Sequence, residues 1–243
     1  MNGGRVLAIA GAKGGIGKTT TSINLAAALT DRGRSVIVVE CDLGMANLVD
    51  FLSLPYRASV DADLHAVLAG NAAPRDAIYP APDGFDVLPS GVCLEGYVAA
   101  DPTRLEQVIP QLRSGYDVVV LDLGAGLSYE SVIPMKIADE VLLVSSPRVA
   151  SVRDTRKTKE LAEFAECTVT GIVFVKSGTG KAPPPERIAD FLDVDLLGHV
   201  PEDDHVPASQ DAGRPVVAEA PNSPAAAAYD DVAKRLARPV APA

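Results

Sequence analysis

A glycine-rich loop between an apolar strand and a helix constrains this chain more than any other feature of its sequence. The loop spans residues 11–20, Gly-Ala-Lys-Gly-Gly-Ile-Gly-Lys-Thr-Thr. The apolar run at residues 5–10 predicts a buried strand, and residues 19–32 show a helical pattern closed by Gly33. Glycines let the backbone approach a phosphate closely, and the first turn of the helix adds the positive end of its dipole. The sequence therefore predicts a phosphate-binding loop.

The side chains of this loop suit a nucleotide and its metal ion. Lys18 is expected to reach the β- and γ-phosphates, and the Thr19 hydroxyl is expected to bind Mg²⁺. An additional lysine, Lys13, precedes Lys18 by five residues, and Ala12 stands where the general phosphate-loop pattern has glycine. Because backbone N–H groups also converge on a polyphosphate in such a loop, we expect the whole segment to bind the nucleotide. The expected contacts are Lys13, Gly14, Gly15, Ile16, Gly17, Lys18, Thr19 and Thr20.

Carboxylates follow two of the apolar runs. Glu40 and Asp42 end one run and, two positions apart on an extended chain, lie on the same side. Asp122 ends another run and is expected to hold Mg²⁺ through a water molecule, because Mg²⁺ gives up its hydration shell reluctantly. Glu40 and Asp42 can thus face the same phosphate–Mg²⁺ site as Thr19 and Asp122.

The string KGGxGKTT at residues 13–20 resembles the deviant phosphate loop of the MinD/ParA superfamily of ATPases. The resemblance extends in order along nearly the whole chain. Residues 40–48 resemble the family's first switch, residues 116–126 its Walker B strand and second switch, residues 147–154 a segment typical of the MinD branch, and residues 200–203 and 213–217 later motifs. The chain is identified as a member of the MinD-like branch, of archaeal type.

The resemblance implies roles for individual residues. Lys13 would reach across a homodimer to the phosphates of the partner subunit and act like an arginine finger, so the catalytic residues would be Lys13, Lys18 and Asp42. Asp42 would position the attacking water, and Glu40, where the family has aspartate, would help to order the Mg²⁺ shell. Gly124 replaces the family's proline in the second switch.

The resemblance also implies nucleotide contacts outside the phosphate loop. Gly126 would present a backbone N–H toward the γ-phosphate. Lys176, Pro201, Glu202 and Asp203 follow strands at which family members contact adenine, largely through the backbone.

Apolar runs and helical patterns alternate along the chain. The expected strands are residues 6–10, 35–40, 85–89, 117–122, 140–145, 168–175 and 195–200, and the expected helices are residues 19–32, 63–69, 102–114, 129–138, 149–166, 185–191 and 224–237. This alternation predicts an α/β fold: a doubly wound, mostly parallel sheet flanked by helices in three layers, as in P-loop NTPases. We expect a single domain over residues 1–243.

Composition limits the partners and the compartment. The net charge of −10 disfavours nucleic acid and anionic lipid, so nucleic-acid binding and direct membrane binding are not expected.

Bacterial MinD proteins typically carry an amphipathic, membrane-seeking helix at their C-terminal end, and the terminal pattern of this sequence is not expected to form one. No signal-peptide pattern precedes the first strand, which predicts a cytoplasmic protein. The acidic, aspartate-rich composition resembles that of proteins from salt-accumulating halophiles, although an acidic protein from a GC-rich genome would look the same.

We therefore expect an ATP-dependent dimerising switch that slowly hydrolyses ATP to ADP and phosphate. It would position a cellular structure, whether the division site, a chemosensory array or motility machinery, through an unidentified protein partner or activator. The alternatives are a ParA-like DNA or plasmid partition ATPase and a small-molecule ATP-dependent ligase that shares the fold. Related iron–sulfur carriers need paired cysteines, but Cys41, Cys93 and Cys167 are far apart in the sequence.

Overall fold

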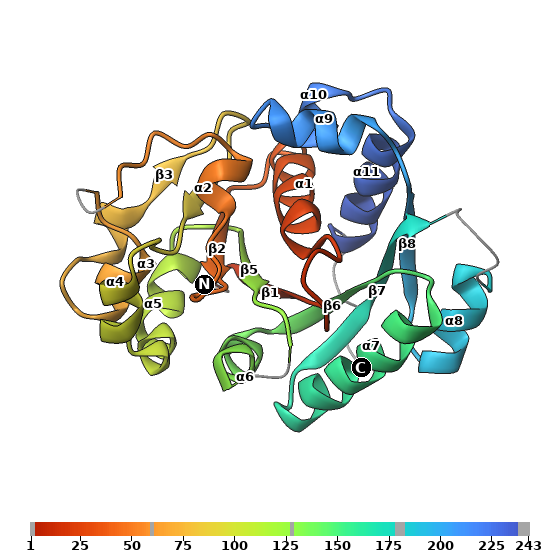
Figure 1. Cartoon of the computed structure of the whole chain (residues 1–243), viewed down its shortest axis with the longest axis horizontal. Coiled ribbons are helices and arrows are strands. Elements are labelled where there is room, and N and C mark those ends of the chain that lie inside the picture. The colour runs from red at the N-terminus through yellow and green to blue at the C-terminus, as the bar shows by residue number, and fades with distance from the viewer. Residues whose placement is uncertain (1–2, 59–60, 127–128, 178–182, 238–243) are drawn as a thin grey trace.

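The computed structural model describes residues 3–58, 61–126, 129–177 and 183–237 (Figure 1). Its centre is an eight-stranded sheet in the order β3-β4-β2-β5-β1-β6-β7-β8. Every neighbouring pair is parallel except β3 and β4, which are antiparallel. The predicted doubly wound, mostly parallel α/β fold is confirmed.

The strands are β1 (Arg5–Ala10), β2 (Val36–Cys41), β3 (Tyr79–Pro80), β4 (Asp86–Leu88), β5 (Val118–Leu123), β6 (Glu140–Ser145), β7 (Thr168–Ser177) and β8 (Leu196–Pro201). The α-helices are α1 (Lys18–Thr30), α2 (Leu48–Phe51), α3 (Leu64–Leu68), α4 (Leu94–Ala99), α5 (Leu105–Arg113), α6 (Tyr129–Ile137), α7 (Val149–Phe164), α8 (Pro185–Leu192), α9 (His205–Asp211), α10 (Val216–Glu219) and α11 (Pro224–Leu236). Short 3₁₀ helices span Pro74–Ala77 and Pro102–Arg104.

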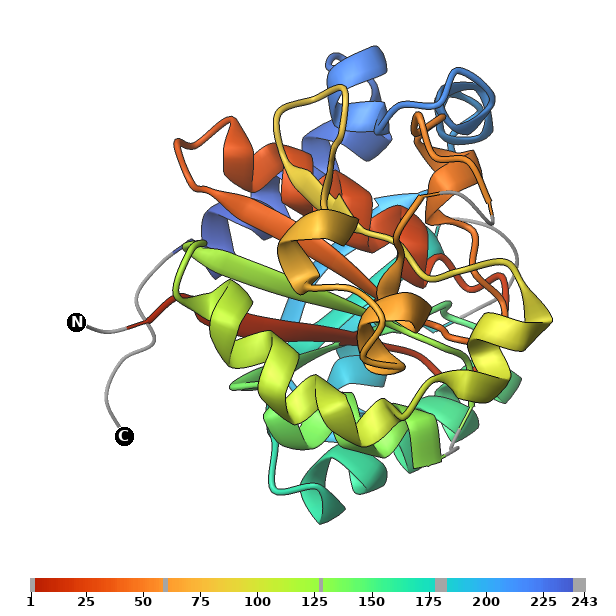
Figure 2. The ribbon, with the colours of Figure 1, turned by 90° about the vertical axis from the view of Figure 1, so that its left-hand side faces the viewer.

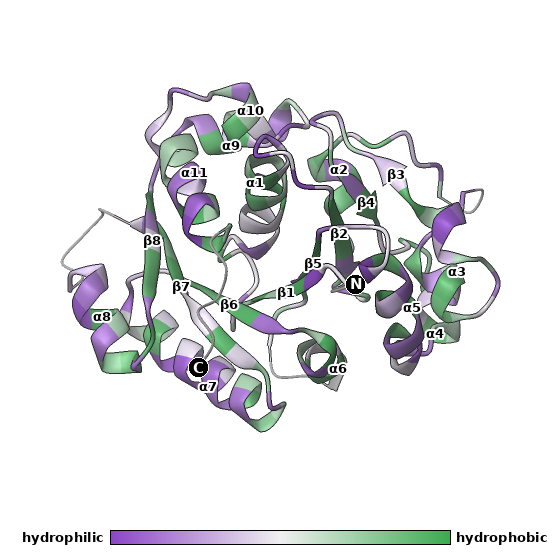
Figure 3. Ribbon diagram, turned by 180° about the vertical axis from the view of Figure 1, so that it is seen from behind, coloured by the Kyte–Doolittle hydropathy of each residue, from purple (hydrophilic) through white to green (hydrophobic). Residues whose placement is uncertain are grey.

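The sheet is covered on both faces, so its strands are apolar throughout rather than alternating with polar residues. In β1, Val6 and Ala8 belong to one core cluster, whereas Leu7 and Ile9 belong to the cluster on the opposite face. Figure 3 shows the central strands as mostly hydrophobic and the outer helices as mixed. Because these strands are buried on both faces, they appear in the sequence as continuous apolar runs and could be predicted from them.

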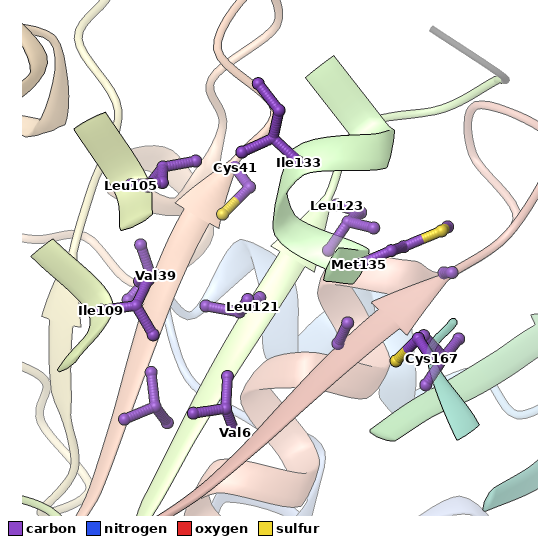
Figure 4. Packing of buried hydrophobic residues seen from close by; sticks show 14 of the residues in the cluster. Val6, Val39, Cys41, Leu105, Ile109, Leu121, Leu123, Ile133, Met135 and Cys167 are labelled. Atoms are coloured by element: carbon purple, nitrogen blue, oxygen red, sulfur yellow. The ribbon is translucent and has the colours of Figure 1, made fainter. Parts of the chain in front are cut away.

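Two helical layers pack on the sheet (Figure 2). One face packs against α3, α5, α6, α7 and α8, and the other against α1, α2, α10 and α11. In Figure 4, Val39 of β2 and Leu121 of β5 lie beside Ile109 of α5. Among the described residues, no helix combines the length and the apolar character that a bilayer span requires.

The predicted strands and helices all form, with ends that differ by a few residues. Five short elements were not predicted from the sequence, each of seven residues or fewer: β3, α2, α4, α9 and α10. Such short elements contain too few residues for a helical or strand period to stand out. In α4 no residue is buried, so no apolar face points to a core.

The two phenylalanines Phe174 and Phe191 test this assignment of the core. Phe174 of β7 is fully buried, whereas Phe191 of α8 is 70% exposed. We expect Phe174→Ala to lower the free energy of unfolding by about 3–5 kcal/mol, because it leaves a cavity in the core. Phe191→Ala should change it by less than about 0.5 kcal/mol. Urea denaturation followed by circular dichroism measures both, and equal losses would contradict the assignment.

Candidate functional site

A cavity of about 1160 Å³ lies at the carboxyl ends of β1, β2 and β5. In open parallel sheets this edge is where ligands bind, because the loops that follow the strands meet there. The cavity is lined by the phosphate loop, by the segment after β2, by residues 91–94 and by the ends of β7 and β8. Segments far apart in the sequence are therefore brought to one site.

The phosphate loop has the backbone geometry of an anion cradle. Gly15 and Gly17 adopt φ of +67° and +100°, in the left-handed region that favours glycine. A Cβ on Gly14 or Gly15 would meet no atom within 4 Å, so the space above the loop is open. Helix α1 begins after Gly17 without a side-chain cap and without an acidic residue in its first turn. Its first N–H groups are therefore available to an anion.

Lys18 lies beneath this open loop and is only 7% exposed. Its Nζ donates to the backbone carbonyl of Lys13 at 3.4 Å. Burial lowers the pKa of Lys18, and the nearby Asp122 and Asp42 carboxylates oppose that shift. A buried ammonium near two carboxylates and an open loop is arranged to hold phosphate oxygens.

Asp122 is the last residue but one of β5 and is 1% exposed. Its Oδ1 accepts a hydrogen bond from the Ser22 hydroxyl at 2.8 Å, and it also interacts with the Thr19 side chain. Burial raises the pKa of Asp122 to about 6, although the bonds from Thr19 and Ser22 and the charge of Lys18 act in the opposite direction. Thr19 and Asp122, two of the predicted metal residues, are thus brought together.

Glu40 lies opposite Asp122 in the β2–β5 register and is fully buried. Its Oε1 accepts bonds from the N–H groups of Asn47 at 2.6 Å and Leu48 at 2.9 Å, and its Oε2 accepts from Ser90 N–H at 2.9 Å. Burial raises the pKa of Glu40 to about 7 against these three bonds. Both oxygens are engaged with the backbone, so Glu40 fixes two loops of the site, and its contribution to a Mg²⁺ shell stays a prediction.

Asp42 lines the cavity two residues after Glu40. Its Oδ1 accepts from Met45 N–H at 3.2 Å. A Cβ on Gly124 would lie 3.1 Å from the Asp42 carboxyl carbon, so the second-switch segment approaches this carboxylate closely. Gly124, which stands where the family has proline, therefore leaves room beside Asp42, the residue expected to position the attacking water.

Lys13 does not line the cavity, unlike its neighbour Gly14. Its Nζ lies 3.0 Å from Asp154 Oδ2 of α7, and both side chains are partly exposed. The first turns of α7 are held on the end of β6 by buried hydroxyls: Thr155 donates to Ser145 at 2.7 Å. Within one copy, the ammonium of Lys13 is thus engaged on α7 and away from the phosphate cavity.

The predicted contacts outside the phosphate loop mostly lie at the cavity. Lys176 has a φ of +53°, and its Nζ donates to the Gly15 carbonyl at 3.1 Å. Pro201, Glu202 and Asp203 also line the cavity. The Asp203 carboxylate, however, accepts from Ala225 N–H and His205 N–H, both at 3.0 Å, and so connects β8 to α11 and α9.

Gly126 has a φ of +100° and follows Ala125, which lines the cavity, but Gly126 itself does not. The buried Ile16 side chain also points away from the cavity, into the core cluster that contains α1. Both residues can bind a nucleotide only through their backbone. Residues 127 and 128 of the second switch lie outside the described residues.

Several polar residues that hold the site together were not predicted from the sequence. Ser22 could have been found, because it lies one helical turn after Lys18 and faces the same way. Ser90 could not, because its backbone N–H bonds to Glu40 from the loop after β4, 50 residues away in the sequence. Gln210, which donates to the Thr20 hydroxyl at 2.8 Å, lies on a helix that the sequence did not reveal.

Comparison with known proteins identifies the family. A model described as an AAA domain matches residues 4–164, and the ParA model, described as a NUBPL iron-transfer P-loop NTPase, matches residues 103–237. An uncharacterised ATP-binding protein of Methanocaldococcus jannaschii is 36% identical over 231 residues, which are 95% of this chain and 86% of that protein.

Two solved structures are similar over nearly the whole chain. The cell division ATPase MinD of Pyrococcus furiosus has a TM-score of 0.91 and 37% identity, and the match covers 96% of this chain and 98% of that one. MinD of Pyrococcus horikoshii OT3, complexed with Mg-ADP, has a TM-score of 0.90 and 35% identity and covers 96% of both chains. With its strand order, phosphate loop and carboxylates, the chain belongs to the ParA/MinD family of P-loop NTPases, in the archaeal-type MinD branch.

Proposed function

We propose that this protein is an ATP-dependent dimerising switch that binds Mg-ATP and hydrolyses it slowly to ADP and phosphate. The observation on which the proposal depends is the position of Lys13, which is paired with Asp154 outside the cavity of its own subunit. A lysine in a phosphate loop that does not face its own phosphate site is available to the phosphate site of a second copy.

The chain supplies the groups that such a nucleotide needs. Lys18 and the first N–H groups of α1 neutralise the phosphates, while Thr19 and Asp122 are the oxygen ligands that suit Mg²⁺. When bound, the ion neutralises charge on the β- and γ-phosphates. Ser22 holds Asp122 in place from the buried side of α1.

Asp42 is the group proposed to orient the attacking water. It lies at the cavity on the segment after β2, and its backbone is fixed from both sides by the bonds of Glu40 to Asn47 and Leu48. A carboxylate held in this way can accept a proton from a water molecule and keep it in line.

Lys13 would complete the site from the partner subunit. Its pair with Asp154 is partly exposed, and such pairs contribute only about 0–1 kcal/mol, so releasing it costs little. A cation from the partner that neutralises the transferring phosphoryl group accelerates reactions of this class by about 10³–10⁵. Turnover would then require association, which makes the enzyme a switch.

We further propose that the dimer recruits an unidentified protein partner and thereby positions a cellular structure. The similarity to MinD of P. furiosus, a cell division ATPase, supports this assignment. Loops held by the γ-phosphate and Mg²⁺ in one state and released in the other are a known way to control recruitment. A DNA-partition ATPase and a small-molecule ligase stay the alternatives, and a nucleotide-independent monomer would favour the ligase.

Lys18→Ala and Lys13→Ala should separate binding from association. Loss of Lys18 removes the phosphate-contacting cation inside the cavity, so ATP binding should fall by at least about a hundredfold. Loss of Lys13 should leave ATP affinity within about threefold of the parent and abolish ATP-dependent dimerisation and turnover. Isothermal titration calorimetry and sedimentation velocity measure the two effects. Equal loss of binding in both variants would contradict the role of Lys13 across the dimer.

Asp42→Ala should bind Mg-ATP and dimerise but not turn over. Removing the carboxylate takes away proton acceptance and water positioning, which together contribute about 10²–10⁴ in rate. Phosphate release and light scattering, followed in one sample, measure turnover and association. A variant that hydrolyses ATP at the parent rate, or stays monomeric with ATP, would show that Asp42 has another role.

Asp122→Asn should stabilise the nucleotide-free protein at pH 7.5 while abolishing stabilisation by Mg-ATP. The pKa of Asp122 is about 6 in the folded chain, above its value of 3.8 in an unfolded chain. Between these two pH values the folded chain binds more protons than the unfolded chain, so the free energy of unfolding falls as pH rises and Asp122 ionises. The gain should be about 1–3 kcal/mol at pH 7.5 and vanish near pH 4.

Asp117→Asn is the matched control at the opposite end of β5. Hydrogen bonds from Ser35 lower the pKa of Asp117, so its neutralisation should not stabilise the protein. Thermal unfolding at both pH values, with and without Mg-ATP, makes the measurement. The assignment of Asp122 is wrong if its variant gains no stability at pH 7.5 or keeps the response to Mg²⁺.

A further inference from the structure

A buried histidine connects two of the loops that line the phosphate cavity. His65 is the second residue of α3 and is only 1% exposed. Its Nε2 lies 3.0 Å from the carbonyl oxygen of Leu43 and 3.1 Å from the hydroxyl oxygen of Ser90. Leu43 directly follows Asp42, and Ser90 lies in the loop after β4. One side chain, which the function proposed above does not use, therefore contacts both loops.

The surroundings of the ring determine which nitrogen of His65 carries the proton. A carbonyl oxygen only accepts hydrogen bonds, so a bond to Leu43 requires the proton on Nε2. The other ring nitrogen, Nδ1, is buried and has no hydrogen-bond partner among the described residues. A proton on Nδ1 would be buried without an acceptor, which is costly. The proton therefore belongs on Nε2, which donates it to the Leu43 carbonyl.

The helix that carries His65 is fixed at its first turn. Asp63 caps α3, because its Oδ1 accepts a hydrogen bond from the N–H of Ala66 at 2.9 Å. The N–H of Leu64 donates to the carbonyl of Pro89 at 2.8 Å and so attaches the start of α3 to the loop after β4. The backbone of His65 is thereby held in place before its ring makes any contact.

Two glycines leave room for the imidazole ring. A Cβ on Gly91 would lie 2.6 Å from Nδ1 of His65, which is too close for two atoms that are not bonded, and a Cβ on Gly96 would lie 3.2 Å from it. Gly91 is not among the glycines with positive φ, so the close approach of the ring, and not the backbone conformation, requires glycine there. The ring of Tyr97 lies 6.0 Å from the imidazole. The ring is therefore enclosed in one orientation.

Different side chains hold the two ends of the segment after β2, residues 42–47, which we refer to as the Asp42 loop. Glu40 holds the far end through the N–H of Asn47, and His65 holds the near end through the carbonyl of Leu43. Because Leu43 is the residue next to Asp42, this bond restrains the backbone from which the Asp42 carboxylate projects. A group that orients a reactant tolerates little displacement, since an error of about 1 Å can cost about 10²-fold in rate.

We propose that His65 is a positioning residue for ATP hydrolysis, which fixes the Asp42 carboxylate by donating from Nε2 to the Leu43 carbonyl. The proposal rests on the water-orienting role of Asp42 proposed above. His65 acts through the Asp42 loop and not on the reacting atoms. Its contact with Ser90 makes the position of this loop depend on the loop after β4 as well.

His65→Leu removes the donor, and His65→Gln supplies an N–H donor again. Phosphate release is measured at protein concentrations above which the rate per molecule no longer rises, and thermal unfolding confirms that each variant is folded. His65→Leu should lower kcat by at least about tenfold and leave KM for ATP within about threefold, because Asp42 is misplaced while the phosphate loop is intact. His65→Gln should recover most of the rate, which a role in packing alone does not predict. His199→Leu, at an exposed histidine of β8 outside the cavity, is the matched control and should keep the parent rate.

The protein without nucleotide supplies a readout that does not depend on hydrolysis. Nitrogen NMR of the unmodified protein should show the ring proton of His65 on Nε2, and the amides of residues 43–46 should exchange faster in His65→Leu than in the parent or in His65→Gln. A ring proton on Nδ1, or a parent rate of phosphate release in His65→Leu, would overturn the proposal. If the parent itself does not hydrolyse ATP but exchange changes as expected, the proposed function fails and the restraint of the Asp42 loop by His65 stands. If exchange at residues 43–46 is unchanged, that restraint is wrong whatever the parent hydrolyses.

Discussion

Two neighbouring carboxylates are buried near the carboxyl ends of β2 and β5, and the site depends on this burial. Glu40 and Asp122 are partners in the β2–β5 register and both are withdrawn from water. Ionised carboxylates in such a place require compensation, which the chain supplies in two ways. Three backbone N–H groups surround Glu40, and hydroxyls with a lysine surround Asp122. One carboxylate thereby organises loops, and the other is the group proposed to bind a cation.

The hydrogen bonds of these two carboxylates explain how separate parts of the chain form one cavity. The loop after β2 and the loop after β4 meet because Glu40 bonds to both. Helix α1 is held on β5 through Ser22 and Asp122, and helix α9 on α1 through Gln210 and Thr20. Polar contacts between elements thus fix the walls of the cavity, while the apolar clusters on the two faces fix the layers.

Most of the fold could be predicted from the sequence, because a parallel sheet covered on both faces needs continuous apolar strands such as Val118–Leu123. The phosphate loop, which follows β1, and Asp122, near the end of β5, could be predicted for the same reason. The partner of Lys13 and the three bonds of Glu40 could not, since they depend on residues brought together only by the tertiary structure. Helix α4 escaped prediction because it is short and buries none of its residues, so no apolar face marks a core.

The strongly acidic charge of the chain would make the proposed association of two copies sensitive to the ions of the surrounding solution. The repulsion between two copies is screened over a Debye length that shrinks from about 10 Å at 0.1 M salt to about 3 Å at 1 M. Excluded salts such as sulfate also strengthen the burial of apolar surface. Both effects would shift the equilibrium between monomer and dimer toward the dimer. The same sequence would therefore switch at a lower protein concentration in a salt-rich cell interior than in a dilute one.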